Sequence, residues 1–141
     1  MMRAYVCFAV ALLACGAKTP PQAPVAPGSA AEQIASGKAV FAQHCAECHG
    51  DAGQGGDKAP PVVGPKALPL NPPATAKKRT MAFHSALDVG KFVMAAMPGD
   101  DPGSLKPDEY LAVLAFDLTA NGVALDQPLT LESAGKIMIH P

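Results

Sequence analysis

Three things are scarce in this sequence: an excess of charge of either sign, a long apolar run, and a set of side chains able to act together as acid, base or nucleophile. Eleven Lys and Arg stand against twelve Asp and Glu, for a net charge of -1. Nucleic acid, which calls for a strongly basic surface, is therefore not an expected partner. The apolar run within residues 1–14 is too short to span a bilayer. An enzyme acting through its own side chains is not expected.

The N-terminus has the pattern of a bacterial export signal, with Arg3 before an apolar run. The run ends in Leu12-Leu13-Ala14-Cys15-Gly16, which resembles a lipobox. In a lipobox, cleavage makes the cysteine the mature N-terminus, and that cysteine carries the lipid. We therefore predict that residues 1–14 are a signal peptide and that Cys15 is a lipidation site. An ordinary cleavable signal, with Cys15 discarded or left idle, is the alternative.

Composition divides the rest of the chain into three parts. Residues 15–28 are rich in Pro and Ala and poor in large apolar side chains. They predict an extended tether that rises roughly 3 Å per residue and reaches on the order of 40 Å. Residues 29–124 are predicted to form the folded domain. Residues 125–141 are then a C-terminal extension, which either packs along the domain, as we favour, or docks a partner.

Only two cysteines remain for the folded domain, because Cys7 lies in the signal and Cys15 is the candidate lipid site. They form the sequence Cys45-Ala46-Glu47-Cys48-His49, and this C-x-x-C-H spacing is the pattern of c-type haem attachment. Two thiols at this spacing can reach the two vinyl groups of a porphyrin, and His49 can then bind the iron. A redox-active pair would follow a strand, and a zinc site would need a second ligand pair.

The segment from about Ala31 to Val123 resembles a class I c-type cytochrome. The resemblance implies an all-α fold, in which N- and C-terminal helices cross and loops wrap one haem. It also implies one haem c, covalently bound through Cys45 and Cys48.

A first helix is predicted from Ser29, which can cap the free N–H groups while Glu32 reaches back to it. By resemblance, Gly37, Phe41 and Cys45 match the spacing of the family helix that crosses the C-terminal helix. Glycine inside a helix costs up to about 1 kcal/mol, so close approach of another helix would explain Gly37. An exposed helix that tolerates the glycine is the alternative.

A second helix is predicted from Ser85, which forms a capping-box-like pair with Asp88. Its apolar positions are expected to form a hydrophobic wall for the haem, in which Phe92 is the aromatic member. The positions on this stripe are Val89, Phe92, Val93 and Ala96.

The C-terminal helix is predicted from Pro107 to about Ala120, although the poor N-cap at Lys106 leaves a start at Ser104 open. Asn121-Gly122 supplies its stop. By resemblance, Phe116 stands where the family places an aromatic at the helix crossing.

The loop after the haem motif contains Pro60-Pro61-Val62-Val63-Gly64, which fits the family pattern Pro-x-Leu-x-Gly with Val62 in place of leucine. In the family, the proline carbonyl accepts a hydrogen bond from the proximal histidine and fixes its ring. The resemblance therefore implies Pro60 as the acceptor for His49, with the adjacent Pro61 as the alternative.

Met97 is the candidate for the second axial iron ligand. It precedes Pro98, and a residue before proline is pushed out of the helical region, so its side chain can leave the helix face. The family's distal ligand is a methionine followed by proline in this setting. The alternatives are His84, Met94, Met81 or an open site.

These features predict a one-electron carrier, exported to the bacterial periplasm or cell surface and anchored to a membrane by lipid. A dehydrogenase, an oxidase or another cytochrome would be its redox partner. Some likeness to cytochrome domains of exported quinoprotein dehydrogenases keeps a haem subunit of a larger complex as an alternative. A gas-binding haem sensor is a third possibility. The basic cluster Lys77-Lys78-Arg79 is expected to be a solvated loop, or else a docking patch for an acidic partner.

Overall fold

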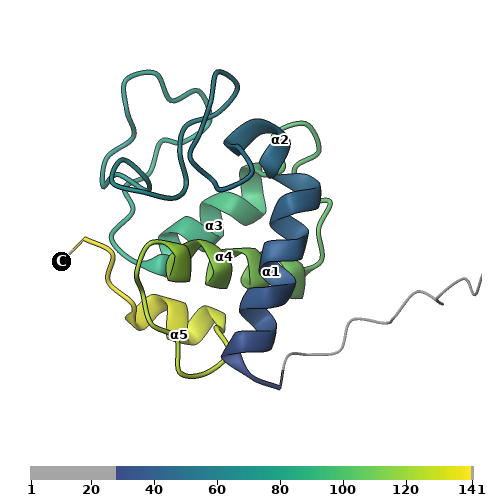
Figure 1. Cartoon of the computed structure of the whole chain (residues 1–141). Helices are drawn as coiled ribbons and strands as arrows, with labels where there is room; N and C mark the ends of the chain where they lie inside the picture. Colours follow the sequence, from purple (N-terminus) through teal and green to yellow (C-terminus); the bar gives the residue numbers. More distant parts are fainter. Residues whose placement is uncertain (1–27, 141) are drawn as a thin grey trace, which may run out of the picture.

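A computed structural model of the chain describes residues 28–140, so the predicted signal peptide and the lipidation site Cys15 lie outside the described residues. The described part is helical (Figure 1), and its only extended pairing is an isolated bridge between Ser85 and Met138. The all-α prediction is confirmed. The helices are α1 (Ala30–His44), α2 (Ala46–His49), α3 (Ala86–Ala96), α4 (Pro107–Ala120) and α5 (Leu131–Lys136).

Local capping signals set where α1 and α3 begin. Ser29 Oγ accepts from the Glu32 backbone N–H at 3.2 Å at the start of α1. At the start of α3, Ser85 Oγ accepts from the Asp88 N–H, and Asp88 Oδ2 accepts from the Ser85 N–H at 2.8 Å. Both predicted caps are therefore present, and each satisfies backbone donors that a helix cannot pair internally.

The C-terminal helix α4 begins at Pro107 and not at Ser104. The poor N-cap Lys106 is compensated by Glu109, whose carboxylate accepts from the Lys106 backbone N–H at 2.8 Å. The helix ends at Ala120 with Asn121 as its C-cap, and Gly122 follows with a φ of 90°, a left-handed conformation that favours glycine.

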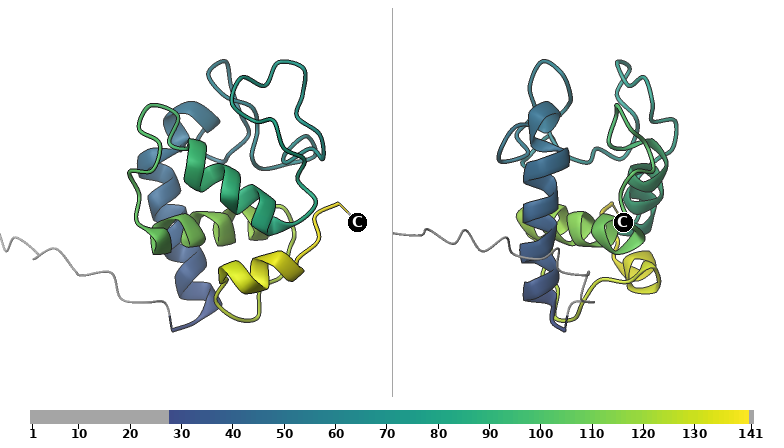
Figure 2. Two further views of the ribbon diagram at one scale, coloured as in Figure 1. Left: turned by 180° about the vertical axis from the view of Figure 1, so that it is seen from behind. Right: turned by 90° about the vertical axis from the view of Figure 1, so that its right-hand side faces the viewer.

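The first and last family helices cross at Gly37, as predicted. α1 packs chiefly against α4, and the two axes cross in both views of Figure 2. A Cβ atom added at Gly37 would overlap the backbone carbonyl of Ala112 on α4. Beside the crossing, the rings of Phe41 and Phe116 lie 5.3 Å apart between centroids, tilted by 53°. The close approach therefore explains both the helical glycine and the aromatic pair.

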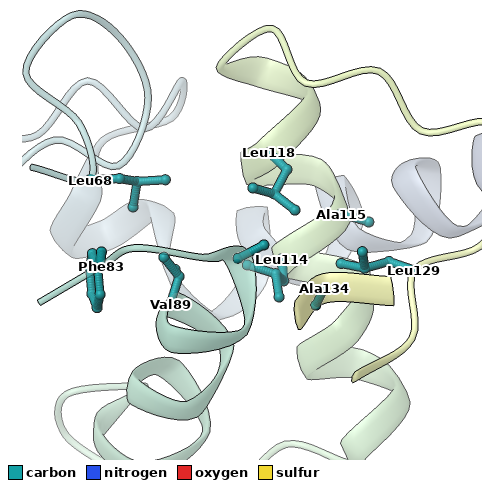
Figure 3. Packing of buried hydrophobic residues seen from close by; sticks show 9 residues of the cluster. Leu68, Phe83, Val89, Leu114, Ala115, Leu118, Leu129 and Ala134 are labelled. Atoms are coloured by element: carbon teal, nitrogen blue, oxygen red, sulfur yellow. The ribbon is translucent and has the colours of Figure 1, made fainter. Parts of the chain in front are cut away.

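The main hydrophobic core lies between α3, α4 and α5 (Figure 3). Val89 is buried in this core with Leu114 and Leu118, so it does not belong to a haem wall as predicted. Phe92 and Val93 lie at the edge of the same cluster and are half-buried. For these two residues and Ala96, the haem wall stays a prediction.

The C-terminal extension packs along the domain, as we favoured. The Gln33 side chain of α1 donates to the Leu129 carbonyl at 3.0 Å and accepts from the Leu129 N–H at 2.6 Å. Ala134 of α5 is fully buried in the main core. Further along, a ring nitrogen of His140 lies 2.8 Å from the carbonyl oxygen of Leu68. The extension therefore ties α1 to the segment that precedes α3.

Within residues 28–140, none of the helices combines the length and the apolar character needed to cross a membrane.

Gly37→Ala is expected to destabilise the protein by about 1–3 kcal/mol, the usual cost of overpacking. An alanine in an open helix would instead gain up to about 1 kcal/mol, so the sign of the change tests the helix crossing. Guanidinium unfolding followed by circular dichroism measures it. Gly56→Ala is the matched control, because a Cβ there meets no atom within 4 Å. Equal stability of the two variants would contradict the close approach.

Candidate cofactor site

The two cysteines of the C-x-x-C-H motif lie at the junction of α1 and α2. Cys45 caps the end of α1, where its N–H donates to the Phe41 carbonyl at 2.8 Å. Its side chain is half-buried against a second cluster that contains Phe41 and Val113, whereas Cys48 is exposed. They form no disulfide with each other or with another described residue. The junction of two helices therefore presents two cysteines at a fixed spacing.

His49 ends α2 and is fixed by the loop that follows it. Its Nδ1 lies 2.7 Å from the carbonyl oxygen of Pro60, the predicted acceptor. Because a carbonyl can only accept, Nδ1 must carry the hydrogen, and a neutral ring then has its free lone pair on Nε2. The hydrogen bond thus selects the tautomer that leaves Nε2 able to bind a metal.

Asn121 holds this loop against the end of α4. Its Nδ2 donates to the Val62 carbonyl at 2.8 Å, and its Oδ1 accepts from the Gly64 N–H at 3.0 Å. The half-buried Val62 side chain packs on the cluster of Phe41 and Val113. The sequence indicated only a helix stop at Asn121. Its second role depends on a loop 57 residues away along the chain and carries no local signal.

Met97 lies where α3 ends, and its backbone is extended, with φ -124° and ψ 153°. The pre-proline argument therefore predicts this geometry correctly. The Met97–Pro98 peptide bond is cis. Tyr110 of α4 donates from Oη to the Met97 carbonyl at 2.7 Å, and the Met97 side chain is half-buried. The C-terminal end of α3 and helix α2 lie at the same end of the molecule (Figures 1 and 2).

The alternative axial ligands are placed differently. His84 is exposed and precedes α3, so the full length of that helix separates it from Met97. Met81 packs against the main core, and Met94 is half-buried within α3. Of these four side chains, Met97 alone follows a helix end at the same end of the molecule as α2.

Phe92, the aromatic residue predicted for the haem wall, lies beside Phe83. Their ring centroids are 5.7 Å apart, and the rings are tilted by 58°. Phe83 is buried in the main core, while Phe92 is half-buried. Phe92 therefore keeps an aromatic surface that an apolar group can cover.

Arg79 is not part of a solvated basic loop, and that prediction is wrong for this residue. It is 8% exposed, and its Cζ lies 3.9 Å from the centroid of the Phe83 ring. One terminal nitrogen donates to the carbonyls of Pro69 and Leu70, at 2.8 and 3.3 Å. A planar, weakly hydrated guanidinium stacks on an aromatic face as an ammonium group cannot, which is why Arg79 is buried while Lys77 is exposed.

Arg79 also lacks a counter-ion in the described part of the chain. The ion pairs among residues 28–140 join Lys58 to Glu47 and Lys136 to Glu132. Within the same residues, the buried Arg79 Nε has no hydrogen-bond partner. A buried cation is ordinarily paired, so this site suits an anionic group that the polypeptide does not supply.

Asp117 of α4 is the other buried ionisable group. It is 5% exposed, and burial raises its pKa to about 7. The pKa of the nearby Cys45 thiol is raised to about 12, mainly by burial and further by the negative charge of Asp117. The sequence did not predict a shifted pKa for either residue. Both shifts come mainly from burial, and burial at a helix crossing depends on a partner helix that lies far away in the sequence.

Comparisons with known proteins identify the family. Residues 32–116, more than half of the chain, match the family described as cytochrome c oxidase, cbb3-type, subunit III. The chain belongs to this family of c-type cytochromes. A search of curated proteins gave no significant match. A cytochrome c domain is an electron-transfer module that carries covalently bound haem c, and such domains are typically exported.

Two solved structures are similar to this cytochrome. The sulfane dehydrogenase SoxCD from Paracoccus pantotrophus aligns with a TM-score of 0.56 and 30% identity, over 74% of this chain and 52% of that chain. The cytochrome thus spans about half the length of the SoxCD chain it matches. Thiosulfate dehydrogenase (TsdBA) from Marichromatium purpuratum aligns with a TM-score of 0.43 and 30% identity, over 60% of this chain and 17% of that chain.

The residues of the site fit haem c on their own chemistry. Cys45 caps the end of α1, Cys48 lies within α2, and His49, whose tautomer the Pro60 carbonyl selects, ends α2. Met97, whose side chain is a thioether, follows α3 at the same end of the molecule. The unpaired guanidinium of Arg79 suits a carboxylate, and haem carries two of them.

The contribution of Asp117 to the free energy of unfolding is expected to fall as the pH rises from about 4 to 7. The folded-state pKa of Asp117, about 7, lies above its ordinary value of 3.8, so the folded protein binds more protons between these limits. The contribution of protonated Asp117 to the free energy of unfolding is complete below pH 3.8, the pKa in the unfolded chain. It is lost above a pH of about 7, the pKa in the folded protein. At 1.36 kcal/mol per pKa unit, the loss is about 4 kcal/mol.

Guanidinium unfolding at pH 4.5 and pH 8 measures this loss in the wild type, in Asp117→Asn and in the exposed control Asp126→Asn. The difference between the wild type and Asp117→Asn is expected to change between the two pH values. The control is expected to follow the wild type. The same pH dependence in all three proteins would rule out a raised pKa at Asp117.

Proposed function

We propose that this cytochrome is an exported one-electron carrier with histidine and methionine as axial ligands, tethered to a membrane by lipid. The observation that carries the proposal is the hydrogen bond from His49 Nδ1–H to the Pro60 carbonyl. It leaves Nε2 of His49 as the nitrogen free to bind iron, and it holds the ring in one orientation.

Cys45 and Cys48 would hold the haem through thioether bonds. The end of α1 fixes Cys45, and α2 fixes the exposed Cys48 three residues later. Because Cys45 caps the end of α1 and Cys48 lies within α2, the attachment would be rigid, and His49 follows it directly. Val62 and Phe92, each half-buried, would cover the ring with apolar surface and exclude water.

Met97 would supply the second axial ligand. Its carbonyl is held by Tyr110, so the backbone from which its side chain departs is fixed to α4. When bound, haem iron supplies the ferrous and ferric states between which one electron is exchanged. Thioether ligation favours the ferrous state and raises the reduction potential.

The buried Arg79 would pair with a carboxylate of the haem. Its guanidinium is already oriented by the Pro69 and Leu70 carbonyls and by the Phe83 ring. This preorganisation supports a fixed orientation of the bound group and offsets the cost of burying a charge.

A second candidate function is a haem subunit of a larger dehydrogenase complex. The likeness to a chain of the sulfane dehydrogenase SoxCD favours it, because the cytochrome matches only about half of that chain. In that setting the electron donor would be a dehydrogenase held in the same assembly, and the chemistry at the haem would be unchanged.

The lipid tether follows from residues that precede the described domain. Cys15 would carry the lipid, with residues 1–14 as signal peptide and residues 15–28 as the Pro-rich spacer. The cytochrome domain, 29–124, and the extension, 125–141, would then be held within about 40 Å of the membrane surface. A carrier so confined meets membrane-bound partners at a raised local concentration.

Met97→Ala is expected to abolish the sulfur-to-iron charge-transfer band of the ferric visible spectrum, because it removes the only axial sulfur. Met94→Ala is the matched control, and it is expected to keep the band, since Met94 lies within α3. Carbon monoxide is expected to bind the reduced wild type slowly and Met97→Ala rapidly. Loss of the band in Met94→Ala with retention in Met97→Ala would reverse the assignment. Rapid binding by the wild type would favour an open site.

Cys15→Ser is expected to prevent incorporation of radiolabelled fatty acid and to release the cytochrome from the membrane fraction. Full haem content in the released protein serves as the control for folding. Retention of both label and membrane association would contradict the lipid anchor. After detergent extraction of the wild type, a single haem-bearing monomer with no second protein would favour a free carrier. A dehydrogenase that co-purifies in constant ratio would favour the complex.

A further inference from the structure

Asp117 is a buried carboxyl group that the proposed electron-transfer function does not use. It belongs to α4, directly after Phe116 at the crossing with α1. Its Oδ1 is buried and has no hydrogen-bond partner among the described residues. The neighbouring amide of Asn121 donates to the carbonyls of Val62 and Asp117 and not to this carboxyl. Asp117 therefore has no evident role in holding the fold.

Cys45 is the titratable neighbour that Asp117 affects. The negative charge of Asp117 contributes to the raised pKa of the Cys45 thiol. Once Cys45 forms a thioether, that sulfur has no proton to exchange, so Asp117 remains as a proton site beside the haem attachment. Other ionisable groups on the elements around α4 are exposed or bonded elsewhere: Glu32, Lys38, His44, Glu47, Lys66, Asp88 and Lys91.

We propose that Asp117 binds a proton when the haem iron is reduced and releases it when the iron is oxidised. When bound, the haem iron would supply the ferric and ferrous states. As the redox partner delivered one electron, the Asp117 carboxylate would take one proton from the solvent, and oxidation would return both. The inference rests on the proposed function, because it needs a haem held through Cys45.

The sign follows from the charges. A ferric porphyrin core carries one positive charge more than a ferrous one, so a nearby carboxylate anion stabilises the ferric state. No donor among residues 28–140 bonds to Asp117 Oδ1, so its anionic form depends on this positive charge more than a solvated carboxylate would. The proton affinity of Asp117 is therefore higher in the ferrous protein, and the reduction potential falls as the pH rises.

Spectroelectrochemical titration of the holoprotein between pH 5 and pH 9 tests the proposal. The wild type is expected to lose potential across the range, and Asp117→Asn is expected to vary much less and to exceed the wild type at high pH. A tenfold difference in proton affinity between the two iron states corresponds to about 59 mV. Asp126→Asn removes an exposed carboxylate and is expected to keep the wild-type slope.

A wild-type potential independent of pH would overturn the proposal. So would an Asp117→Asn variant with the full wild-type slope, since the haem carboxylates would then account for it. The reduced-minus-oxidised infrared spectrum gives a second readout: a protonated-carboxyl band is expected to appear on reduction and to be lost in Asp117→Asn. If that variant does not fold, absence of the band in the wild type overturns the proposal.

The proposed function fails by a different observation. A wild-type ferric spectrum without the sulfur-to-iron band would contradict axial ligation by Met97. The pH dependence of the potential would still decide the role of Asp117, because it requires attachment through Cys45 and not a particular sixth ligand.

Discussion

The close approach of α1 and α4 at Gly37 is the constraint on which the rest of this cytochrome depends. With no side chain at Gly37, the backbone of α1 rests directly on the Ala112 carbonyl. This contact sets Phe41 against Phe116 one turn further along. It also places Cys45, the C-cap of α1, where the negative charge of Asp117 contributes to the raised pKa of its thiol. The contact of Gly37 with α4 thus sets the position of Cys45, the first cysteine of the proposed haem attachment, eight residues later.

Helix α4 then positions both candidate axial residues through hydrogen bonds at its two ends. Near its start, Tyr110 donates to the Met97 carbonyl. At its end, Asn121 binds Val62 and Gly64, in the loop whose Pro60 orients His49. The two candidates come from segments far apart in the chain, yet hydrogen bonds from one helix hold both segments. On the proposed function, such a frame would keep the ligand positions constant between iron states and would favour fast electron exchange, because little would have to move.

Sequence patterns predict the features that depend on neighbours in the chain. The caps at Ser29 and Ser85 and the extended backbone of Met97 each follow from residues within four positions. The contact of Gly37 with Ala112 and the hydrogen bond of His49 to Pro60 join residues further apart in the chain. These two features were predicted from the family resemblance. Arg79 and Gln33 escaped prediction because their partners, the Phe83 ring and the Leu129 backbone, are identified only by the fold. A basic run and a polar helix position look solvent-exposed in a sequence.

Arg79 and Asp117 are the two described residues that bury a polar side-chain atom without a partner, and they carry opposite charge. Marginal stability gives a small domain little room for such groups unless another component compensates them. Their chemistry separates the two roles. A guanidinium stays protonated at any physiological pH, so Arg79 provides a constant positive charge. A buried carboxyl can be neutral or anionic, so Asp117 provides a charge that varies with pH and with the iron. On the proposed function, Arg79 would shift the reduction potential of the haem iron by a constant amount. Asp117 would make that reduction potential depend on pH.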